Sequence, residues 1–113
     1  MMSVNKRRGE ISAILDGKDY CLCLTLGALA ELEAAFEADD LGALVQRFSS
    51  GRLSASDLVK VIGAGLRGGG ADVSDDDVGA MRCDDGAAGY ARIASDLLAV
   101  TFGAPDAAAP ANP

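Results

Sequence analysis

Apolar and polar residues alternate on both sides of an Asp-Gly pair near the start of the chain. The alternation runs through residues 10–15 before the pair and through 18–24 after it. Such alternation is typical of β-strands, and Asp-Gly is favoured in two-residue hairpin turns. The pattern therefore predicts a β-hairpin that turns at Asp16 and Gly17. Apolar residues occupy both sets of alternating positions, so helices must cover at least one face of the hairpin, or its edges must pair with another chain.

The spacing of apolar residues then changes from two to three and four, which predicts a helix over residues 26–37. Thr25 is its expected N-cap. A second helix is predicted over 41–48, after the start signal Asp39-Asp40, and 49–51 are expected to end it. The expected inner stripe of the first helix consists of Leu26, Leu29, Leu32 and Phe36. The apolar members of the second helix are Leu41, Leu44, Val45 and Phe48.

A third helix is expected to begin at a cap formed by Ser54 or Ser56 and to stop at the glycine run 68–70. Gly63 and Gly65 lie within its apolar pattern, where small residues would let another backbone approach closely. Its expected inner face consists of Leu58, Val61, Ile62, Gly65 and Leu66.

Two further helices are predicted, over 75–82 behind the cap Ser74 and over 87–102 before Gly103. In the last helix, residues recur at the spacing of an α-helix at Tyr90, Ile93, Ala94, Leu97, Leu98 and Thr101. The predicted fold class is α+β, mostly helical, with an N-terminal β-hairpin followed by four or five α-helices. We expect a flexible N-terminus over 1–9, one domain over 10–103 and a disordered Pro/Ala tail over 104–113.

Charge and hydropathy narrow the function classes. The 113 residues include 17 acidic and 10 basic ones, for a net charge of −7, which argues against a nucleic-acid binder because phosphate contacts need Lys and Arg. The run Lys6-Arg7-Arg8 is interpreted as a solvated tail.

There is no apolar run long enough to span a membrane, and the N-terminal residues do not follow the pattern of a signal peptide. We therefore expect a cytoplasmic protein with reduced thiols.

Candidate chemistry is sparse. The chain has no His and three Cys, so it lacks His-based catalysis and a closed four-thiolate zinc site. Cys21, Cys23 and Cys83 are interpreted as core thiols. Glu31, Glu33 and Glu37 fit a solvated helix flank. We predict no catalytic residue, metal or cofactor, and a protein that is not an enzyme.

Two loops resemble ligand sites only superficially. The stretch 65–70 follows a predicted helix and lacks the Lys-Ser/Thr ending of a phosphate loop, so a helix stop explains it. The acidic stretch 72–77 departs from a calcium loop because Asp77 occupies the position that requires Gly and Cys83 the position of the bidentate Glu. A helix cap on an acidic face explains it.

Several stretches do point to a family: Gly9-Glu10, Leu15-Asp16-Gly17, Tyr20, Thr25-Leu-Gly-Ala-Leu-Ala-Glu-Leu-Glu33, Gly51-Arg52-Leu-Ser-Ala55 and Gly65-Leu-Arg-Gly-Gly-Gly70. With these, residues 9–103 resemble small proteins of gene transfer agents and related prophages. That family is described as phage tail assembly chaperones and was formerly labelled tail tube proteins. The resemblance rests on the combination of 25–33 and 65–70 at this spacing.

The resemblance implies a non-enzymatic chaperone that binds a tape-measure protein during assembly of a phage-like tail, with tail tube subunits or self-association as further partners. The alternative is a structural tail tube or connector component. A tube ring needs many strands, and one hairpin is too few, which favours the chaperone. Arg52 and Arg67 are the candidate partner-binding residues.

Overall fold

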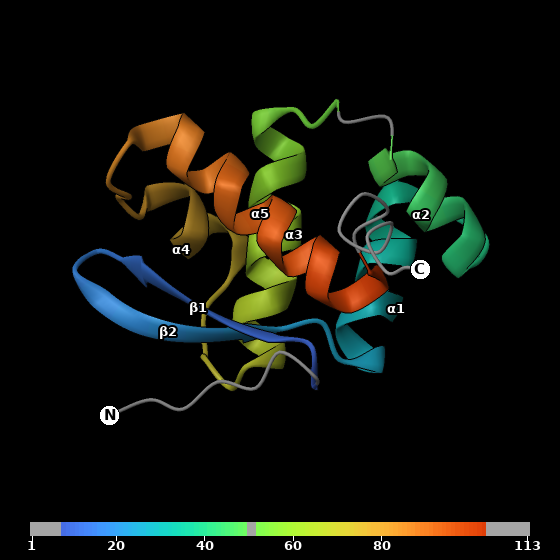
Figure 1. The fold of residues 1–113 in the computed structure, drawn as a ribbon, viewed down its shortest axis with the longest axis horizontal. Helices are drawn as coiled ribbons and strands as arrows, with labels where there is room; N and C mark the ends of the chain where they lie inside the picture. The colour runs from blue at the N-terminus through green and yellow to red at the C-terminus, as the bar shows by residue number, and fades with distance from the viewer. Residues whose placement is uncertain (1–7, 50–51, 104–113) are drawn as a thin grey trace, which may run out of the picture.

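A computed structural model of the chain describes residues 8–49 and 52–103, and within them it confirms an α+β fold that is mostly helical. In this described part of the chain, a two-stranded hairpin precedes five helices (Figure 1). Residues 1–7 of the predicted flexible N-terminus 1–9 lie outside the described residues, as do Ser50 and Gly51 of the predicted helix end and the predicted tail 104–113. The elements are β1 Glu10–Leu15, β2 Lys18–Cys23, α1 Leu26–Phe36, α2 Leu41–Ser49, α3 Ala55–Gly68, α4 Asp75–Ala80 and α5 Gly86–Phe102.

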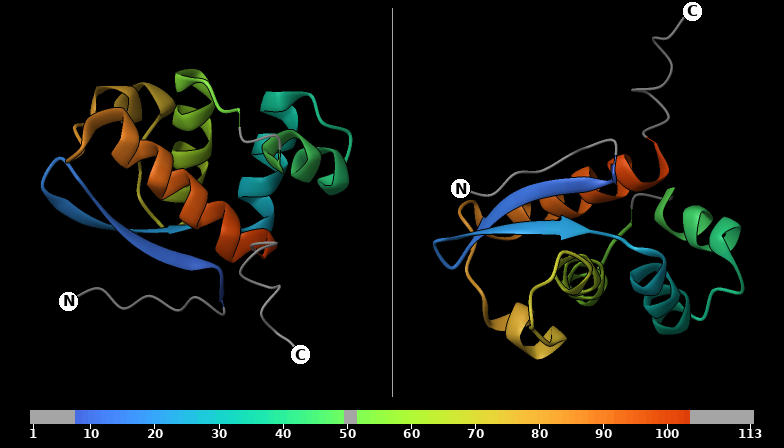
Figure 2. Two further views of the ribbon diagram at one scale, coloured as in Figure 1. Left: turned by 45° about the horizontal axis from the view of Figure 1, so that its top comes forward. Right: turned by 90° about the horizontal axis from the view of Figure 1, so that it is seen from below.

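The hairpin turns where the sequence predicts. Strands β1 and β2 are antiparallel, with Leu15 opposite Lys18, so Asp16 and Gly17 form the whole loop. Their φ angles are 54° and 73°, which are the positive values of a type I′ turn. On the inner face Ile11, Ala13, Leu15 and Leu22 are buried. The right-hand view in Figure 2, which shows the molecule from below, shows α5 beside β1 and α3 beside β2, and these pairs of elements pack on each other.

Helix α1 begins at the expected cap, because the Thr25 hydroxyl oxygen accepts the Ala28 amide at 3.1 Å. It ends one residue earlier than predicted, at Phe36, because Glu37 is in the left-handed conformation. Leu29 and Leu32 are buried as expected, but the prediction for Leu26 is wrong, since this side chain is 80% exposed. A helical side chain leans toward the helix N-terminus, so at the first position Leu26 extends beyond the part of α1 that packs.

Helix α2 packs through two of the four apolar members that the sequence pattern names. Leu44 and Phe48 are buried, and the Phe48 ring meets Phe36 of α1 edge to face with centroids 5.4 Å apart. The other two apolar members, Leu41 and Val45, are 40% and 38% exposed. Among the described elements α2 packs mainly on α1, so its buried face is narrow.

Helix α3 lies at the centre of the described fold and contacts β2, α1, α4 and α5. Ser54 is the cap, in a reciprocal capping box with Asp57, which decides between the two predicted serines. Val61, Ile62 and Leu66 are fully buried. A Cβ at Gly65 would lie 2.5 Å from Leu97 Cδ2, so this glycine makes room for a side chain of α5 rather than for a backbone.

The predicted glycine stop is confirmed at Gly68, where α3 ends, but it has a second structural role. A Cβ at Gly68 would lie 2.0 Å from the Cys23 carbonyl oxygen, and one at Gly69 would lie 1.9 Å from the Cys21 carbonyl oxygen. The end of α3 therefore abuts the backbone of β2, at a distance that only glycine permits.

The last two helices follow the prediction with shifted ends. Ser74 forms a capping box with Asp77 at the start of α4. This helix ends at Ala80 rather than at 82, because Met81 is extended. Helix α5 begins one residue earlier than predicted and buries Ala94 and Leu97.

Candidate interaction surfaces

Within residues 8–49 and 52–103, no group of three or more Cys, Asp or Glu side chains is placed to hold a metal ion. The three thiols are free and half-buried. Cys83 packs against the core, whereas Cys21 and Cys23 lie on the outer face of the hairpin, opposite the buried Leu22, so the prediction of core thiols is wrong for these two. Burial raises the pKa of Cys21 and of Cys83, which keeps these thiols protonated and unreactive near neutral pH.

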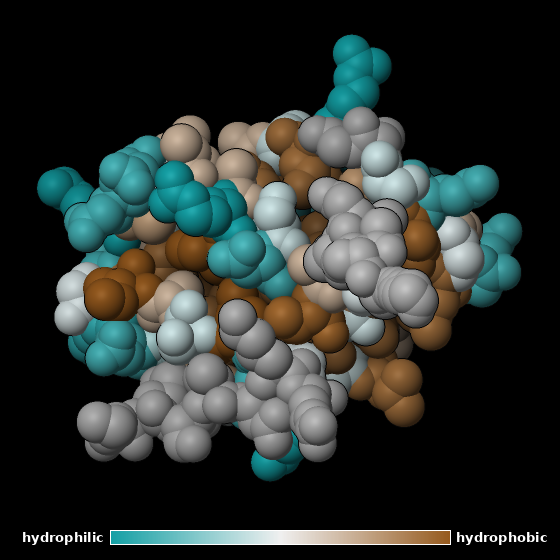
Figure 3. All heavy atoms as spheres, in the orientation of Figure 1, coloured by the Kyte–Doolittle hydropathy of each residue, from teal (hydrophilic) through white to brown (hydrophobic). Residues whose placement is uncertain are grey.

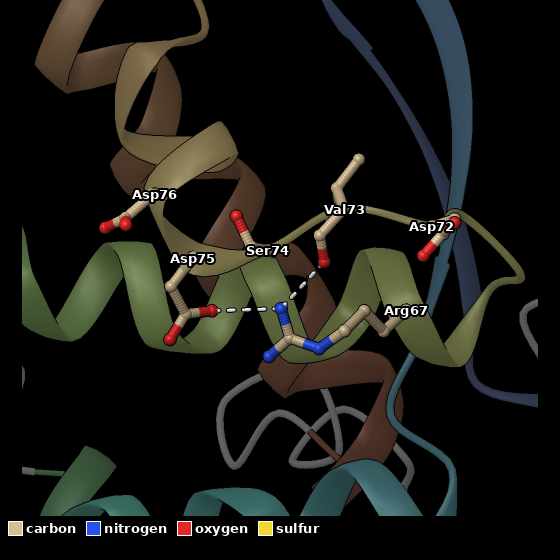
Figure 4. A pocket seen from close by; sticks show the side chains of 6 residues that line it. All are labelled: Arg67, Asp72, Val73, Ser74, Asp75 and Asp76. Carbon is tan, nitrogen blue, oxygen red and sulfur yellow. Dashed lines mark hydrogen bonds and ion pairs between the residues drawn. The ribbon is translucent and has the colours of Figure 1, made fainter.

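The acidic stretch after α3 lines an open hollow that includes Arg67 (Figure 4). The Arg67 Nη1 donates to the Val73 carbonyl at 3.1 Å and lies 3.0 Å from Asp75 Oδ1. That carboxylate oxygen is buried and receives no hydrogen bond of good geometry, so the nearby guanidinium charge is what compensates its burial. The hollow is therefore explained by a contact that attaches α4 to α3.

Arg67 also reaches a third helix. Its Nη2 donates to Glu31 Oε1 of α1 at 2.7 Å. This hydrogen bond is the main reason that the pKa of Arg67 is raised above its ordinary value. The candidate partner-binding residue Arg67 thus lies at a junction of α1, α3 and α4, and its side chain is 29% exposed. A partner that binds this guanidinium would compete with Glu31 and Asp75.

The other candidate, Arg52, is exposed and lies before the cap of α3. Arg67 lies near the end of α3, whose 14 residues extend about 20 Å along the helix axis, so the two arginines lie at opposite ends of this helix. The structure therefore does not bring the two arginines together into one basic site.

The most exposed large apolar side chains of the described residues were not predicted as a surface. They are Ile14 at 58%, Leu26 at 80%, Leu41 at 40% and Val45 at 38%. Leu41 and Val45 are one turn apart on α2, so they lie on the same side of this helix. Figure 3 shows hydrophobic surface interrupted by polar side chains on the visible face. The spacing of apolar residues identifies these positions. It could not show that Leu44 and Phe48 of α2 are buried while Leu41 and Val45 are exposed.

No helix in the described part of the chain has the length and apolar character needed to cross a membrane.

Comparison with known proteins gives one family. Residues 8–104 match the family described as "Phage tail tube protein, GTA-gp10", in which GTA denotes gene transfer agents. No curated protein and no solved structure gives a significant match. The match includes every helix and strand described above. It confirms the resemblance to a phage tail family of gene transfer agents, under the tail tube description rather than the chaperone description. The chain therefore belongs to this phage tail protein family of gene transfer agents.

Proposed function

We propose that this protein is a non-enzymatic assembly chaperone that binds the tape-measure protein while a phage-like tail is built. The family match supports a role in the tail. The observation that carries the choice of a chaperone is the two-stranded sheet, which is all the sheet that the described residues contain. A tube wall needs enough strands to close a β-rich ring.

The exposed apolar residues of α1 and α2 support a contact with a helical partner. Leu26, Leu41 and Val45 offer apolar surface on helices, and tape-measure proteins are long and helical, as the resemblance implies. An amphipathic helix binds such surface through its own apolar stripe. Arg52 and Arg67 are proposed as polar contacts beside it. For Arg67 the contact would replace part of its bonding to Glu31 and Asp75.

A second candidate function is a structural component of the tail tube or a connector. The description of the matching family as a phage tail tube protein favours it directly. In that case the protein would remain in the mature particle, and its helices rather than its hairpin would have to supply most subunit contacts.

Co-expression with the tape-measure-like protein of the same gene cluster tests the chaperone. We expect the chain to co-purify with that protein and to increase its soluble fraction. The double variant Leu41→Ser/Val45→Ser should reduce both effects without unfolding, since these side chains are exposed. Ala91→Ser, at an exposed position of α5, is the control and should behave as wild type.

Mass spectrometry of purified particles separates the two candidates. A chaperone should be absent from mature tails or present only in traces. Stoichiometric presence in tails, combined with no effect on tape-measure solubility, would reject the chaperone in favour of the structural component.

A further inference from the structure

Helix α2 has an outward face that carries no charge. In Figures 1 and 2 this helix lies at the edge of the described fold, beside α1, on which it mainly packs. Five of its residues are both exposed and uncharged, and at 3.6 residues per turn they fall within about 140° of the helix circumference. These residues, here called the α2 face, are Leu41, Gly42, Val45, Gln46 and Ser49.

Arg47, the one charged residue in the sequence of α2, lies outside this face. Its side chain is directed toward α1 and α3, where Nη2 lies 3.4 Å from Asp57 Oδ1 and Cζ lies 5.2 Å from the centre of the Phe36 ring. The outward side of a surface helix normally carries charged side chains. An outward face with Leu41 and Val45 and no charge is instead typical of a surface that another molecule covers.

Gly42 leaves a depression in the α2 face that the fold itself does not require. A Cβ at Gly42 would have Asp40 Oδ1 as its nearest neighbour, at 3.4 Å, which is an ordinary contact distance. A Cβ at Gly65, by contrast, would overlap Leu97 Cδ2 at 2.5 Å. The internal packing therefore explains the glycine at 65 but not the one at 42.

The depression lies beside a ridge of side chains. Residues four apart on a helix form ridges, and a ridge of a neighbouring helix packs into the groove between them. Leu41, Val45 and Ser49 form one such ridge, and Gly42 and Gln46 form the next. Because Gly42 has no side chain, the groove is open at this point, and a partner helix can approach the α2 backbone closely.

The N-terminal end of the α2 face is acidic. Glu37, Asp39 and Asp40 are all exposed and lie just before the helix. Asp40 also caps α2, since its Oδ1 accepts the Ala43 amide at 2.8 Å. Carboxylates at one end of an uncharged face favour a partner with Lys or Arg at the matching position. A basic helix therefore suits this face better than a second copy of the chain, which carries the same net charge of −7.

We propose that the α2 face binds an amphipathic helix of the tape-measure protein whose apolar stripe crosses α2 at Gly42 and ends in Lys or Arg beside Asp39. This inference rests on the proposed function and specifies the kind of segment that is bound. The apolar stripe contacts Leu41 and Val45, and the basic residue lies beyond the first turn of α2. Because the ionic contact is at an exposed end, added salt should weaken the binding.

Peptides that tile the tape-measure-like protein of the same gene cluster are the probe, and fluorescence titration with the full chain measures their dissociation constants. The peptides that bind should have an amphipathic helical pattern with Lys or Arg at one end of the stripe. Gly42→Gln fills the depression and should weaken binding about tenfold or more, whereas Gly42→Ala should weaken it less. Gly79→Gln is the matched control, because a Cβ at this position of α4 has no neighbour within 4 Å. Circular dichroism checks that each variant is folded.

Asp39→Lys tests the acidic end of the α2 face. At low salt it should weaken binding of the same peptides about tenfold, and at high salt the loss should shrink because the charges are screened. Asp96→Lys makes the same change of net charge at an exposed position of α5 and should have little effect. Equal losses in the two variants would show that only net charge matters and would overturn the contact at Asp39.

The outcomes separate this inference from the proposed function. Peptide binding that Gly42→Gln leaves unchanged would keep the chaperone but reject the α2 face as its site. Co-purification with the tape-measure-like protein but with none of its peptides would contradict a single helical segment as the ligand. No binding to the protein or its peptides would reject the proposed function and this inference together. A dimer in sedimentation equilibrium that Gly42→Gln dissociates would assign the face to a second copy and would also overturn the proposal.

Discussion

Asp16 and Arg82 hold each other through two hydrogen bonds of equal length. The Asp16 amide donates to the Arg82 carbonyl at 2.8 Å, and the Arg82 amide donates to Asp16 Oδ1 at 2.8 Å. The bonds join the tip of the hairpin to the segment between α4 and α5. Asp16 also has a φ of 54°, a conformation that Asp and Asn tolerate better than most residues.

Substitution of Asp16 tests this joint. Asp16→Ala removes the side-chain acceptor and places a less suitable residue at positive φ, so we expect a loss of about 1–3 kcal/mol in the free energy of unfolding. Asp16→Asn keeps an oxygen acceptor and the tolerance for positive φ, and should lose much less. Urea denaturation of both variants measures the difference. Equal losses would show that neither the hydrogen bond nor the backbone conformation contributes.

Substitution of Gly68 tests the contact between α3 and the β2 edge. The methyl group of Gly68→Ala would overlap the Cys23 carbonyl, so the backbone must shift and stability should fall by about 1–3 kcal/mol. Gly79→Ala is the matched control because a Cβ there has no neighbour within 4 Å. In α4 it should be neutral or stabilising by up to about 1 kcal/mol through helix propensity. The midpoint of thermal unfolding should fall for Gly68→Ala and should stay unchanged or rise for Gly79→Ala. A Gly68→Ala protein as stable as the wild type would contradict the close contact.

Two leucines of α1 test which side of this helix is buried. Leu29 is 7% exposed and Leu26 is 80% exposed. Leu29→Ala should therefore cost about 2–5 kcal/mol, since it removes buried methyl groups and leaves a cavity. Leu26→Ala should change stability by no more than about 0.5 kcal/mol. Denaturant titration compares the two, and similar losses would place both leucines in the core.

The parts of the fold that depend on neighbours in sequence could be predicted. Asp16-Gly17 determines the turn through its own φ preferences, and Thr25 and Ser74 cap helices through amides three residues away. These signals need no knowledge of the rest of the molecule.

The parts that depend on distant contacts could not be predicted. The sequence suggests that Arg67 is exposed, because no neighbouring residue indicates its ion-pair partner. That partner is Glu31, 36 residues earlier, whose Oε1 lies 2.7 Å from Arg67 Nη2. The glycines at 68 and 69 indicate a helix stop, but the strand that they approach is more than forty positions away in the chain. Leu26 and Val45 have the right period, and only the packing of their helices shows that they are exposed.

Alkaline pH should destabilise the protein through Tyr90 and Cys83. Burial is the main cause that raises the pKa of each, from ordinary values of 10.0 and 9.0, and the Tyr90 hydroxyl also donates to the Met81 carbonyl. Above those values the folded protein keeps protons that the unfolded chain has lost, so the free energy of unfolding falls as pH rises. The stabilisation from these two groups is fully present below their ordinary pKa values. It is lost as the pH rises through their higher pKa values in the folded protein.

Urea midpoints measured from neutral to strongly alkaline pH check this dependence. Tyr90→Phe should be less stable at neutral pH, because the Met81 carbonyl loses its donor, but should show a shallower decline above the ordinary pKa of tyrosine. Cys83→Ser should likewise flatten the earlier part of the decline. An unchanged slope in both variants would assign the alkaline loss to other groups.

The packing of α5 along β1 also bears on how the protein is made. The first strand meets the last helix, and a Cβ at Gly9 would lie 3.9 Å from the Val100 carbonyl oxygen. Because the ribosome releases the chain from its N-terminus, β1 and β2 can pair early, but Ile11 and Leu15 stay uncovered until α5 has left the exit tunnel. The hairpin must therefore wait with its apolar face exposed for most of translation, and this interval is when the nascent chain is most vulnerable to aggregation.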